Sequence, residues 1–536
     1  MTDIKAERSM RHLTRTRRDV FKYAAIVGAG AGITSLTKPL SQETIAQQAE
    51  GTPTPGGMLN MGVAGELKVL DPHITTLSVY ATTLRFTIFE TLIEADDDGN
   101  YIPSLADSWE LADDGMSLTL NLAQGAMFHN GKGFTSDDVA FTVQRVKDPE
   151  LASQFAPQLA NVESVETPDE YTAVLQLTAP TPAILDYLLN VQIVTEQDID
   201  AIGERPVGTG PFEFVEWVLN DHITVRKFAD YRQEGLPYLD EIVFRPVLDV
   251  DTRLTNLQAG SLDLIEQPAP KDAERIKGDA TLQLIVTPPT SKYDNFSINT
   301  QNPLMADPKV RQAMSFAFDR ESYVRDILYG FGVTAVCPFP VTNWAFDAAT
   351  CDPYLAFDLD KAAQLLEEAG HPGGQGLEGI DIMSPLGYPE LKAAAVLLQA
   401  NLGALGITAT VSELELAAWI DRLVTQPDYA LSTNTYGYGD VDPSTFFTRD
   451  SINPETNVQL YKNDEYARLV QEGASTVDEE ARKEIYAQIL QIMMDEMPGF
   501  LIAHKQDLFA AKKTVQGFNP GPLIRHHYEK TWIAEA

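Results

Sequence analysis

The chain has 536 residues, of which 44% are apolar and 22% charged, an ordinary globular composition with enough sequence for several domains. Acidic residues outnumber basic ones by 77 to 40, so the formal net charge is −37, which argues against nucleic acid or an anionic membrane surface as the main partner. Two cysteines are too few for a thiolate zinc ribbon, an iron–sulfur cluster or a disulfide-dense scaffold.

The N-terminal segment has the order of charges and apolar residues found in export signals. Residues 1–22 are basic and include the pair Arg17 and Arg18, and the weakly apolar stretch 24–36 follows. That stretch is shorter than the roughly 20 residues needed to span a bilayer, and the adjacent arginines resemble a twin-arginine signal. We expect a signal peptide over 1–46 and no lipid anchor, because no cysteine is near the cleavage position. A disordered basic tail is the alternative.

Folded structure is expected to begin after a short linker. Residues 47–57 are rich in Gly, Pro and Thr and show no periodicity, so the first ordered element is expected near Met58. Alternating polar and apolar residues predict half-buried strands over 117–122 and, less strictly, over 171–177.

Helical spacing of apolar residues predicts several helices. Ser136 is the expected N-cap of the first, and Gly370 and Gly406 are expected to end two others. In chain order these helices cover residues 137–145, 362–369, 391–405 and 479–494. Because strands and helices alternate, the sequence predicts α/β or α+β layers.

Short motifs along most of the chain occur in one characteristic order. They are LADSWE (105–110), FHNGKGFTSDDV (128–139), VGTGPF (207–212), GLPYLD (235–240), LQAGSLD (257–263), INT (298–300), DPKVRQA (307–313) and VQGF (515–518). In this order they resemble the family 5 extracellular solute-binding proteins, the dipeptide, oligopeptide and nickel receptors of ABC importers. The blocks cover roughly residues 58–520.

The resemblance implies an α/β, two-lobed periplasmic-binding-protein fold of type II, with two crossing hinge strands and an extra subdomain. The ligand is expected between the lobes, where its differential contacts favour the closed form. The implied parts are lobe I over 58–292 and 502–536, the extra subdomain over about 75–205, lobe II over 293–501, and crossings near 293–298 and 498–503.

The function implied by the resemblance is capture of a small solute, most readily a di- or oligopeptide, for delivery to ABC permease subunits in the inner membrane. We expect a monomer in the periplasm, with no reaction, cofactor or metal. A receptor for a nickel chelate or an oligosaccharide stays open as an alternative. An exported enzyme is a further alternative, but the chain has no G-x-S-x-G or H-E-x-x-H motif, and its glycine-rich stretch 28–32 lies inside the signal.

One segment is the candidate anchor for a peptide's amino group. Residues 434–443 (NTYGYGDVDP) occupy the position where peptide receptors of this family carry an aromatic-x-x-Asp-x-x-Asp-Pro segment, whose first Asp pairs with the α-ammonium. Here a Tyr replaces the usual Trp, and only Val441 separates Asp440 from Asp442. Asp440 is therefore the expected ammonium ligand, flanked by Tyr436 and Tyr438. The alternative is that both acids cap a turn.

Further residues complete the expected site. The remaining ligand contacts are Asn434, Asp442, Trp344, Trp419 and Tyr293. Cys337 and Cys351 are expected to form a disulfide, since an oxidising compartment permits one, and the closed loop could present Trp344 to the ligand. Two buried free thiols are the alternative.

Three other residues or pairs are expected to be structural. Trp109 is expected in the core, His129 as a structural histidine and not a metal ligand, and His526–His527 as a solvated pair whose side chains point apart.

Overall fold

A computed structural model describes residues 51–75, 78–96, 98–289, 292–437, 441–447, 452–521 and 525–535. They belong to one compact unit, Thr44–Ala536. The expected signal residues Arg17 and Arg18, and the expected ligand residues Tyr438 and Asp440, lie outside these described ranges.

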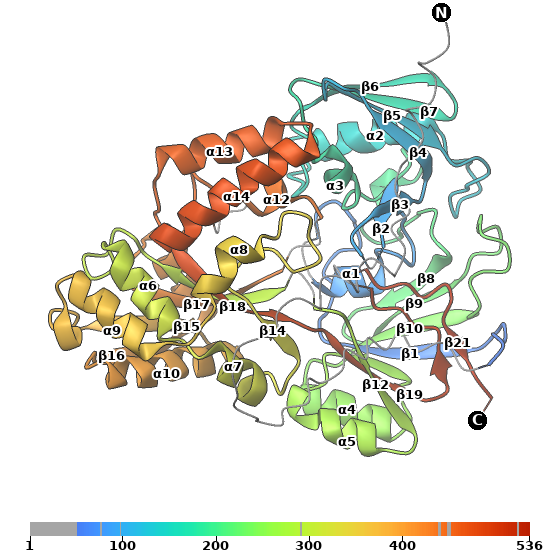
Figure 1. Cartoon of the computed structure of the whole chain (residues 1–536). Coiled ribbons are helices and arrows are strands. Elements are labelled where there is room, and N and C mark those ends of the chain that lie inside the picture. The colour runs from blue at the N-terminus through green and yellow to red at the C-terminus, as the bar shows by residue number, and fades with distance from the viewer. Residues whose placement is uncertain are drawn as a thin grey trace, which may run out of the picture. The chain divides into compact units, whose positions relative to one another are not determined.

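The first large sheet has seven strands and contains both β1, from the start of the described chain, and β19, from near its end. β1 begins at Met58, as the end of the linker predicted, and runs parallel to β10 and β11 in the centre of the sheet. Helices α4 (Val250–Gln258) and α5 (Ala273–Gly278) are close to it in Figure 1. The strand order is β12 (Leu282–Val286), β19 (Leu508–Lys512), β11 (Leu264–Glu266), β1 (Met58–Val63), β10 (Glu241–Pro246), β9 (His222–Lys227) and β8 (Phe212–Val218).

A four-stranded antiparallel sheet is inserted between β1 and β8. Its order is β4 (Ala106–Leu111), β5 (Ser117–Leu122), β7 (Thr172–Leu177) and β6 (Val162–Asp169), and it carries α2 (Ser136–Lys147) and α3 (Ile184–Leu188). We call these elements the subdomain. They share one buried apolar cluster, against which the half-buried Trp109 packs. Short elements beside it are α1 (Ser78–Thr83), β2 (Ile93–Ala95) and β3 (Tyr101–Pro103).

The predicted cap of α2 is displaced by one residue. Thr135, not Ser136, is the N-cap, and it forms a capping box with Asp138. The Ser136 hydroxyl instead donates to the carbonyl of Asp169 at 2.6 Å. The two strands predicted from alternation coincide with β5 and β7.

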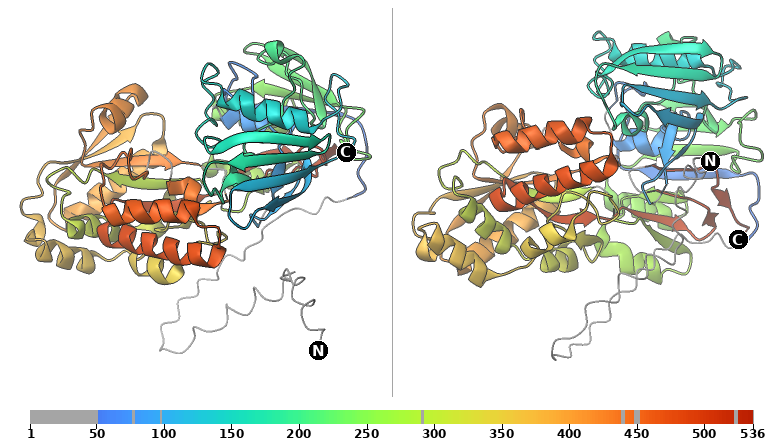
Figure 2. Two further views of the ribbon diagram at one scale, coloured as in Figure 1. Left: turned by 90° about the horizontal axis from the view of Figure 1, so that it is seen from above. Right: turned by 45° about the horizontal axis from the view of Figure 1, so that its top comes forward.

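The second large sheet has six strands. Parallel pairing joins β15 to β16 and β17, whereas β13 lies antiparallel between β17 and β18. In Figure 1 this part is drawn mainly in yellow to red, and Figure 2 shows helices beside its sheet from two further directions. The order is β14 (Gly332–Thr334), β18 (Gly499–Lys505), β13 (Tyr293–Ile298), β17 (Leu431–Tyr436), β15 (Ile380–Pro385) and β16 (Ala409–Leu414).

Amphipathic helices cover this sheet. The longest, α14, buries Ile485 and Ile489 and half-buries Ile492, the face that the sequence predicts to point inward. The helices are α6 (Pro308–Phe316), α7 (Arg320–Ser322), α8 (Ala348–Cys351), α9 (Leu359–Glu368), α10 (Pro389–Ala404), α11 (Leu416–Ile420), α12 (Pro443–Phe447), α13 (Asp464–Ser475) and α14 (Glu479–Glu496).

Two short connections join the large sheets. The chain leaves the seven-stranded sheet after β12 and enters the six-stranded sheet at β13, and it returns from β18 to β19 through residues 506–507. The return lies a few residues after the predicted segment, because β18 keeps its pairing as far as Lys505. The connections bond to each other: Lys505 N donates to Lys292 O at 2.8 Å, and Lys292 Nζ lies 2.7 Å from Asp507 Oδ1.

We call the part built on the seven-stranded sheet, with its subdomain, lobe I, and the part built on the six-stranded sheet lobe II.

Candidate ligand-binding site

The candidate site is the end of the six-stranded sheet that lies beside the two connections. We call this end of the sheet the edge of lobe II. The parallel strands β15, β16 and β17 all end at this edge, at Pro385, Leu414 and Tyr436. β13 runs the opposite way, so its first residue, Tyr293, pairs with Tyr436 directly after the first connection. Ligands of open α/β sheets bind outside the carboxyl ends of the strands. This edge is therefore where a ligand could contact both lobes.

Two of the predicted aromatic residues meet at this edge. The rings of Tyr293 and Tyr436 lie 5.8 Å apart between centroids, and Tyr293 also contacts Phe446 at 5.9 Å. Tyr293 is buried and Tyr436 half-buried. The two rings therefore form an aromatic surface at the point where β17 ends.

Asn434 and Trp419 are linked through one serine. Asn434 is buried; its Nδ2 donates to Ser297 Oγ at 2.8 Å, and Ser432 Oγ donates to its Oδ1 at 3.2 Å. The indole N–H of the half-buried Trp419 donates to the same Ser432 Oγ at 3.1 Å. Bonds inside lobe II therefore use the polar groups of both residues.

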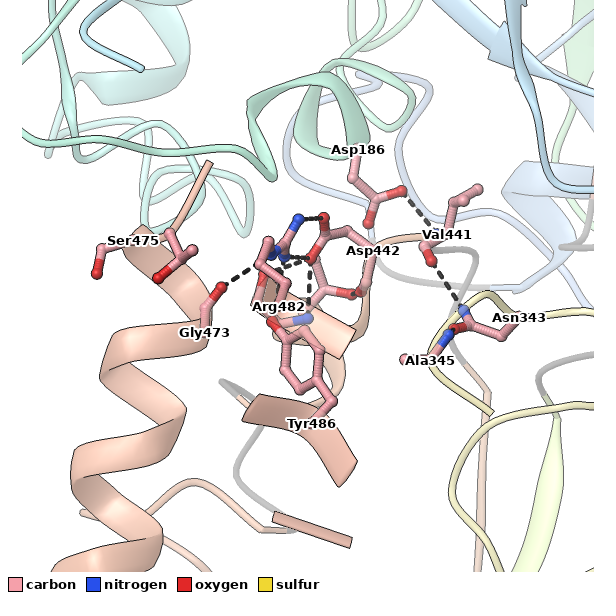
Figure 3. A network of polar contacts seen from close by, with 12 residues as sticks. Asp186, Asn343, Ala345, Val441, Asp442, Gly473, Ser475, Arg482 and Tyr486 are labelled. Carbon is pink, nitrogen blue, oxygen red and sulfur yellow. Dashed lines mark hydrogen bonds and ion pairs between the residues drawn. The ribbon is translucent and has the colours of Figure 1, made fainter. Parts of the chain in front are cut away.

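Asp442 is held by a buried arginine (Figure 3). Its carboxylate accepts two hydrogen bonds from Arg482, at 2.6 and 2.8 Å, and both side chains are about 95% buried. Asp442 Oδ1 also accepts the backbone N–H of Ser444 at 2.9 Å at the start of α12. Burial lowers the pKa of Arg482, but the charge of Asp442 and the hydrogen bonds to Asp442 and Tyr486 together outweigh this effect and leave the pKa above its usual value. Because Arg482 occupies its carboxylate, we leave Asp442 out of the proposed ligand contacts.

The disulfide loop contacts Val441 through Asn343, a residue that was not predicted from the sequence. Cys337 and Cys351 are joined, with their Cα atoms 5.6 Å apart. The half-buried Trp344 packs against Tyr486 at 5.7 Å, and the Arg482 guanidinium lies 5.1 Å from its ring. Its neighbour Asn343 donates from Nδ2 to the carbonyl of Val441 at 2.8 Å, as Figure 3 shows. The indole is thus engaged within lobe II.

The residue between the two acids contacts lobe I. The backbone N–H of Val441 donates to Asp186 Oδ1 at 2.7 Å (Figure 3), and Asp186 is fully buried in α3. The two residues are 255 positions apart in the chain. Nothing in the local sequence pattern indicates the pairing.

A charge pair between a half-buried lysine and a buried aspartate lies directly before the return connection. Lys505 Nζ lies 2.8 Å from Asp294 Oδ1 and donates to Thr435 Oγ1 at 2.8 Å, and the Tyr323 hydroxyl donates to Asp294 Oδ2 at 2.7 Å. Burial lowers the pKa of Lys505, but the carboxylates of Asp294, Glu390 and Asp507 together outweigh this effect, and the net pKa lies above its usual value. These groups hold β13, β17 and β18 together beside the candidate site.

The histidines His129, His526 and His527 contact protein groups. Gly208 N donates to His129 Nδ1 at 3.3 Å, and His129 Nε2 lies 3.0 Å from Gly210 O; burial lowers its pKa to about 4. Within the described ranges no group of three or more His, Cys, Asp or Glu side chains is arranged to hold a metal ion. The prediction that His526 and His527 form a solvated pair is wrong for His526, whereas His527 is half-buried. His526 is buried against Pro520 O, and His527 lies between Glu94 and Glu529.

A separate pocket of about 460 Å³ is lined by residues of lobe I alone. Some of its charged groups pair with one another: Arg232 lies 2.9 Å from Glu90, and His527 lies 3.4 Å from Glu94 and 3.6 Å from Glu529. The two carboxylates outweigh the effect of burial and raise the pKa of His527 to about 9. The residues that line this pocket do not include those at the carboxyl ends of the lobe II strands.

The fold and this edge define a two-lobed α/β binding protein. Two sheets, two short connections and a set of strand ends at those connections form the architecture in which a hinge closes two lobes around a ligand. The profile of the bacterial extracellular solute-binding proteins, family 5, matches residues 100–457. The chain belongs to this family of binding proteins.

Individual relatives span nearly the whole chain. The oligopeptide-binding protein AppA of Bacillus subtilis is 27% identical over 522 residues, which cover 92% of this chain and 95% of AppA. Heme-binding protein A of Haemophilus influenzae is 30% identical over 458 residues, 78% of this chain and 82% of the relative. The structure of AgaA from A. tumefaciens R10 in complex with agropinic acid has a TM-score of 0.73 and 28% identity, covering 90% of this chain and 99% of AgaA.

Among the described helices, none combines the length and apolar character needed to cross a membrane.

Proposed function

We propose that this protein is the substrate-binding component of an ABC importer that captures a di- or oligopeptide between lobes I and II and delivers it to a membrane permease. The observation that carries the proposal is the edge of lobe II at which β15, β16 and β17 end beside both connections. Membership of a family of solute-binding proteins supports it, as does the similarity to a protein named for binding oligopeptides.

The proposed anchor of the peptide is Asp440. It directly precedes Val441, whose backbone is bound from both lobes. It also follows Tyr436 by four residues of chain, and the ring of Tyr436 contacts that of Tyr293. A carboxylate beside aromatic rings suits a cationic nitrogen, because charge pairing offsets desolvation and ring faces add about 0.5–2 kcal/mol. Trp419, which lies in α11 shortly after β16, is proposed to contact the side chains of the ligand.

Other classes of solute are alternatives to a peptide ligand. The relatives named for heme and agropinic acid show that proteins similar to this chain bind different solutes. A nickel chelate or an oligosaccharide is the second candidate class. The acid Asp440 favours a ligand with a free amino group over an oligosaccharide, since a neutral sugar offers no cation to pair with it.

We further propose that the protein catalyses no reaction and acts as a monomer in the periplasm. Arg17 and Arg18 support export by the twin-arginine route, and the lack of a cysteine near residue 50 supports a mature protein without a lipid anchor. The ABC permease is the proposed partner, and the strongly acidic composition supports the absence of nucleic acid.

The amino-group anchor is tested by calorimetry with two matched ligands, trialanine and N-acetyl-trialanine. The wild type is expected to bind the free amine at least tenfold more tightly, about 1.4 kcal/mol. Asp440→Asn is expected to lose this preference while the melting temperature of the ligand-free protein stays unchanged. Asp428→Asn, an exposed acid just before the opposite end of β17, is the control and should bind as the wild type does. Equal binding of both ligands by the wild type would refute the anchor, and binding of neither would refute the peptide class.

A further inference from the structure

Val441 is a residue of lobe II whose side chain lies in the core of the subdomain. It follows β17 and precedes α12, yet it is 9% exposed and belongs to the apolar cluster that the subdomain elements share. The approach is close, since a Cβ added at Gly99 in lobe I would stand 3.9 Å from Val441 Cγ1. Separation of the lobes would expose this side chain to water.

Both backbone polar groups of Val441 are bound by side chains, one from each lobe. Its N–H donates to Asp186 of lobe I at 2.7 Å, and its carbonyl accepts from Asn343 of lobe II at 2.8 Å. Asp186 is fully buried, so water does not compete for this bond. Hydrogen bonds to a charged acceptor are stronger than neutral ones.

The lobe II side of this contact is rigidly supported. Asn343 lies in the disulfide loop, and its Oδ1 accepts the N–H of Ala345 at 2.9 Å. The residue after Val441 is Asp442, fixed by Arg482 (Figure 3). Val441 is thus presented to lobe I at a set position.

The subdomain and lobe II also approach each other at the turn between β4 and β5. Gly115, between β4 and β5, lies against Val477 of the α13–α14 loop, so closely that an added Cβ would stand 2.7 Å from Val477 Cγ2. The subdomain therefore contacts lobe II at two points, both distant in sequence from the connections.

We propose that Val441 and Asp186 form a latch between the lobes: a contact made only when the lobes are closed, which raises ligand affinity without either side chain binding the ligand. Opening of the lobes would break the hydrogen bond between Val441 N and Asp186, and water would have to hydrate both groups. Opening would also expose the apolar side chain of Val441, so the latch favours the closed form. Because apparent affinity scales with the fraction of protein in the competent form, a weaker latch weakens binding of every ligand alike. The effect on affinity rests on the proposed function; the contact itself does not.

The test uses two latch variants and one control in the full-length mature protein. Asp186→Ala removes the acceptor, and Val441→Asp places a charge in the apolar cluster while leaving the polar contacts within lobe I intact. The control is Asp138→Ala, because Asp138 is also a buried carboxylate of the subdomain but bonds within it, to Lys132 at 2.6 Å and to Thr135 N at 3.0 Å. A role confined to subdomain stability would make Asp138→Ala behave like Asp186→Ala.

Three quantities are measured for each protein. Hydrogen exchange reports the amide of Val441. Energy transfer between dyes on unnatural amino acids at the exposed positions Leu219 of lobe I and Val424 of lobe II reports lobe separation. Calorimetry reports affinity for trialanine. Both latch variants are expected to exchange the amide of residue 441 at least tenfold faster, to show lower energy transfer and to bind trialanine about tenfold more weakly, whereas the control keeps wild-type values of all three.

Unchanged exchange and unchanged energy transfer in both latch variants would overturn the latch, as would the same changes in Asp138→Ala. If the wild type binds no trialanine, the proposed peptide class fails for that probe, while exchange and energy transfer still decide the latch.

Discussion

Replacing Arg482 by Leu is expected to destabilise lobe II strongly. The side chains of Arg482 and Asp442 are only 6% and 5% exposed, and two hydrogen bonds of 2.6 and 2.8 Å join them. Removing one partner of a buried pair leaves an uncompensated charge and typically costs about 3–5 kcal/mol. The variant also removes the donor to Gly473 O and the cation beside Trp344. We therefore expect the free energy of unfolding to fall by about 3–5 kcal/mol.

Urea denaturation followed by far-ultraviolet circular dichroism measures this loss. In the double variant with Asp442→Asn the carboxylate charge is gone but an oxygen remains to cap α12, so most of the stability should return. Arg468→Leu is the control, because Arg468 pairs with Glu465 and Glu472 on the exposed face of α13 and should matter little. A loss in Arg482→Leu no larger than in the control, or a double variant less stable than the single one, would refute the reasoning.

The remaining predictions concern pH, the disulfide and export. Because the folded state holds the pKa of His129 near 4 while an unfolded histidine titrates near 6.5, the unfolded state binds more protons in this window. Stability should therefore fall as pH drops from 6.5 to 4, and the slope in His129→Gln should be smaller by about 1.4 kcal/mol per pH unit, with an unchanged slope contradicting this. Thiol labelling of the denatured, unreduced protein should find neither Cys337 nor Cys351 free, and replacing both by Ser should cost about 3 kcal/mol; two labelled thiols would exclude the bridge. Lysine at positions 17 and 18 should keep the precursor in the cytoplasm, and normal export of that variant would show that the arginine pair is incidental.

Local structure was predictable because it is encoded in short-range patterns. Alternation over Ser117–Leu122 gave the bounds of β5, and apolar spacing from Glu479 onward gave α14 to within two residues. The cap of α2 was misplaced by one residue because adjacent Thr and Ser are both good N-caps, and only the position of Asp138 three residues after Thr135 distinguishes them.

The family was predictable because its motifs are scaffold residues at fixed turns. In VGTGPF, a Cβ added at Gly208 would stand 2.0 Å from Ile88 O, so the close passage of two backbones requires glycine there. Such motifs identify the fold but carry no information on the ligand. Asp440 and Tyr438 lie outside the described residues, so their roles stay predictions.

The long-range partners could not be predicted from one sequence. Strand geometry indicates that adjacent histidines point apart, but not that His527 meets Glu94 or that His526 is buried beside Pro520. The same holds for Val441 and Asp186, since a hydrogen bond between a backbone N–H and an acid 255 residues away leaves no periodic trace. Trp344 was expected at the ligand because the resemblance places this stretch near the cleft, but one sequence does not indicate that Tyr486 and Arg482 contact its ring.

The most direct test of the peptide-capture proposal is to identify the ligand that the protein carries when it is purified from its native host. The protein is purified without refolding, denatured, and the released small molecules are identified by mass spectrometry, with Asp440→Asn prepared in parallel. The account predicts a di- or oligopeptide, or a mixture of them, with free amino termini, in near-stoichiometric amount from the wild type and much reduced from the variant. Release of a sugar, a nickel chelate or another solute without a cationic nitrogen would contradict it.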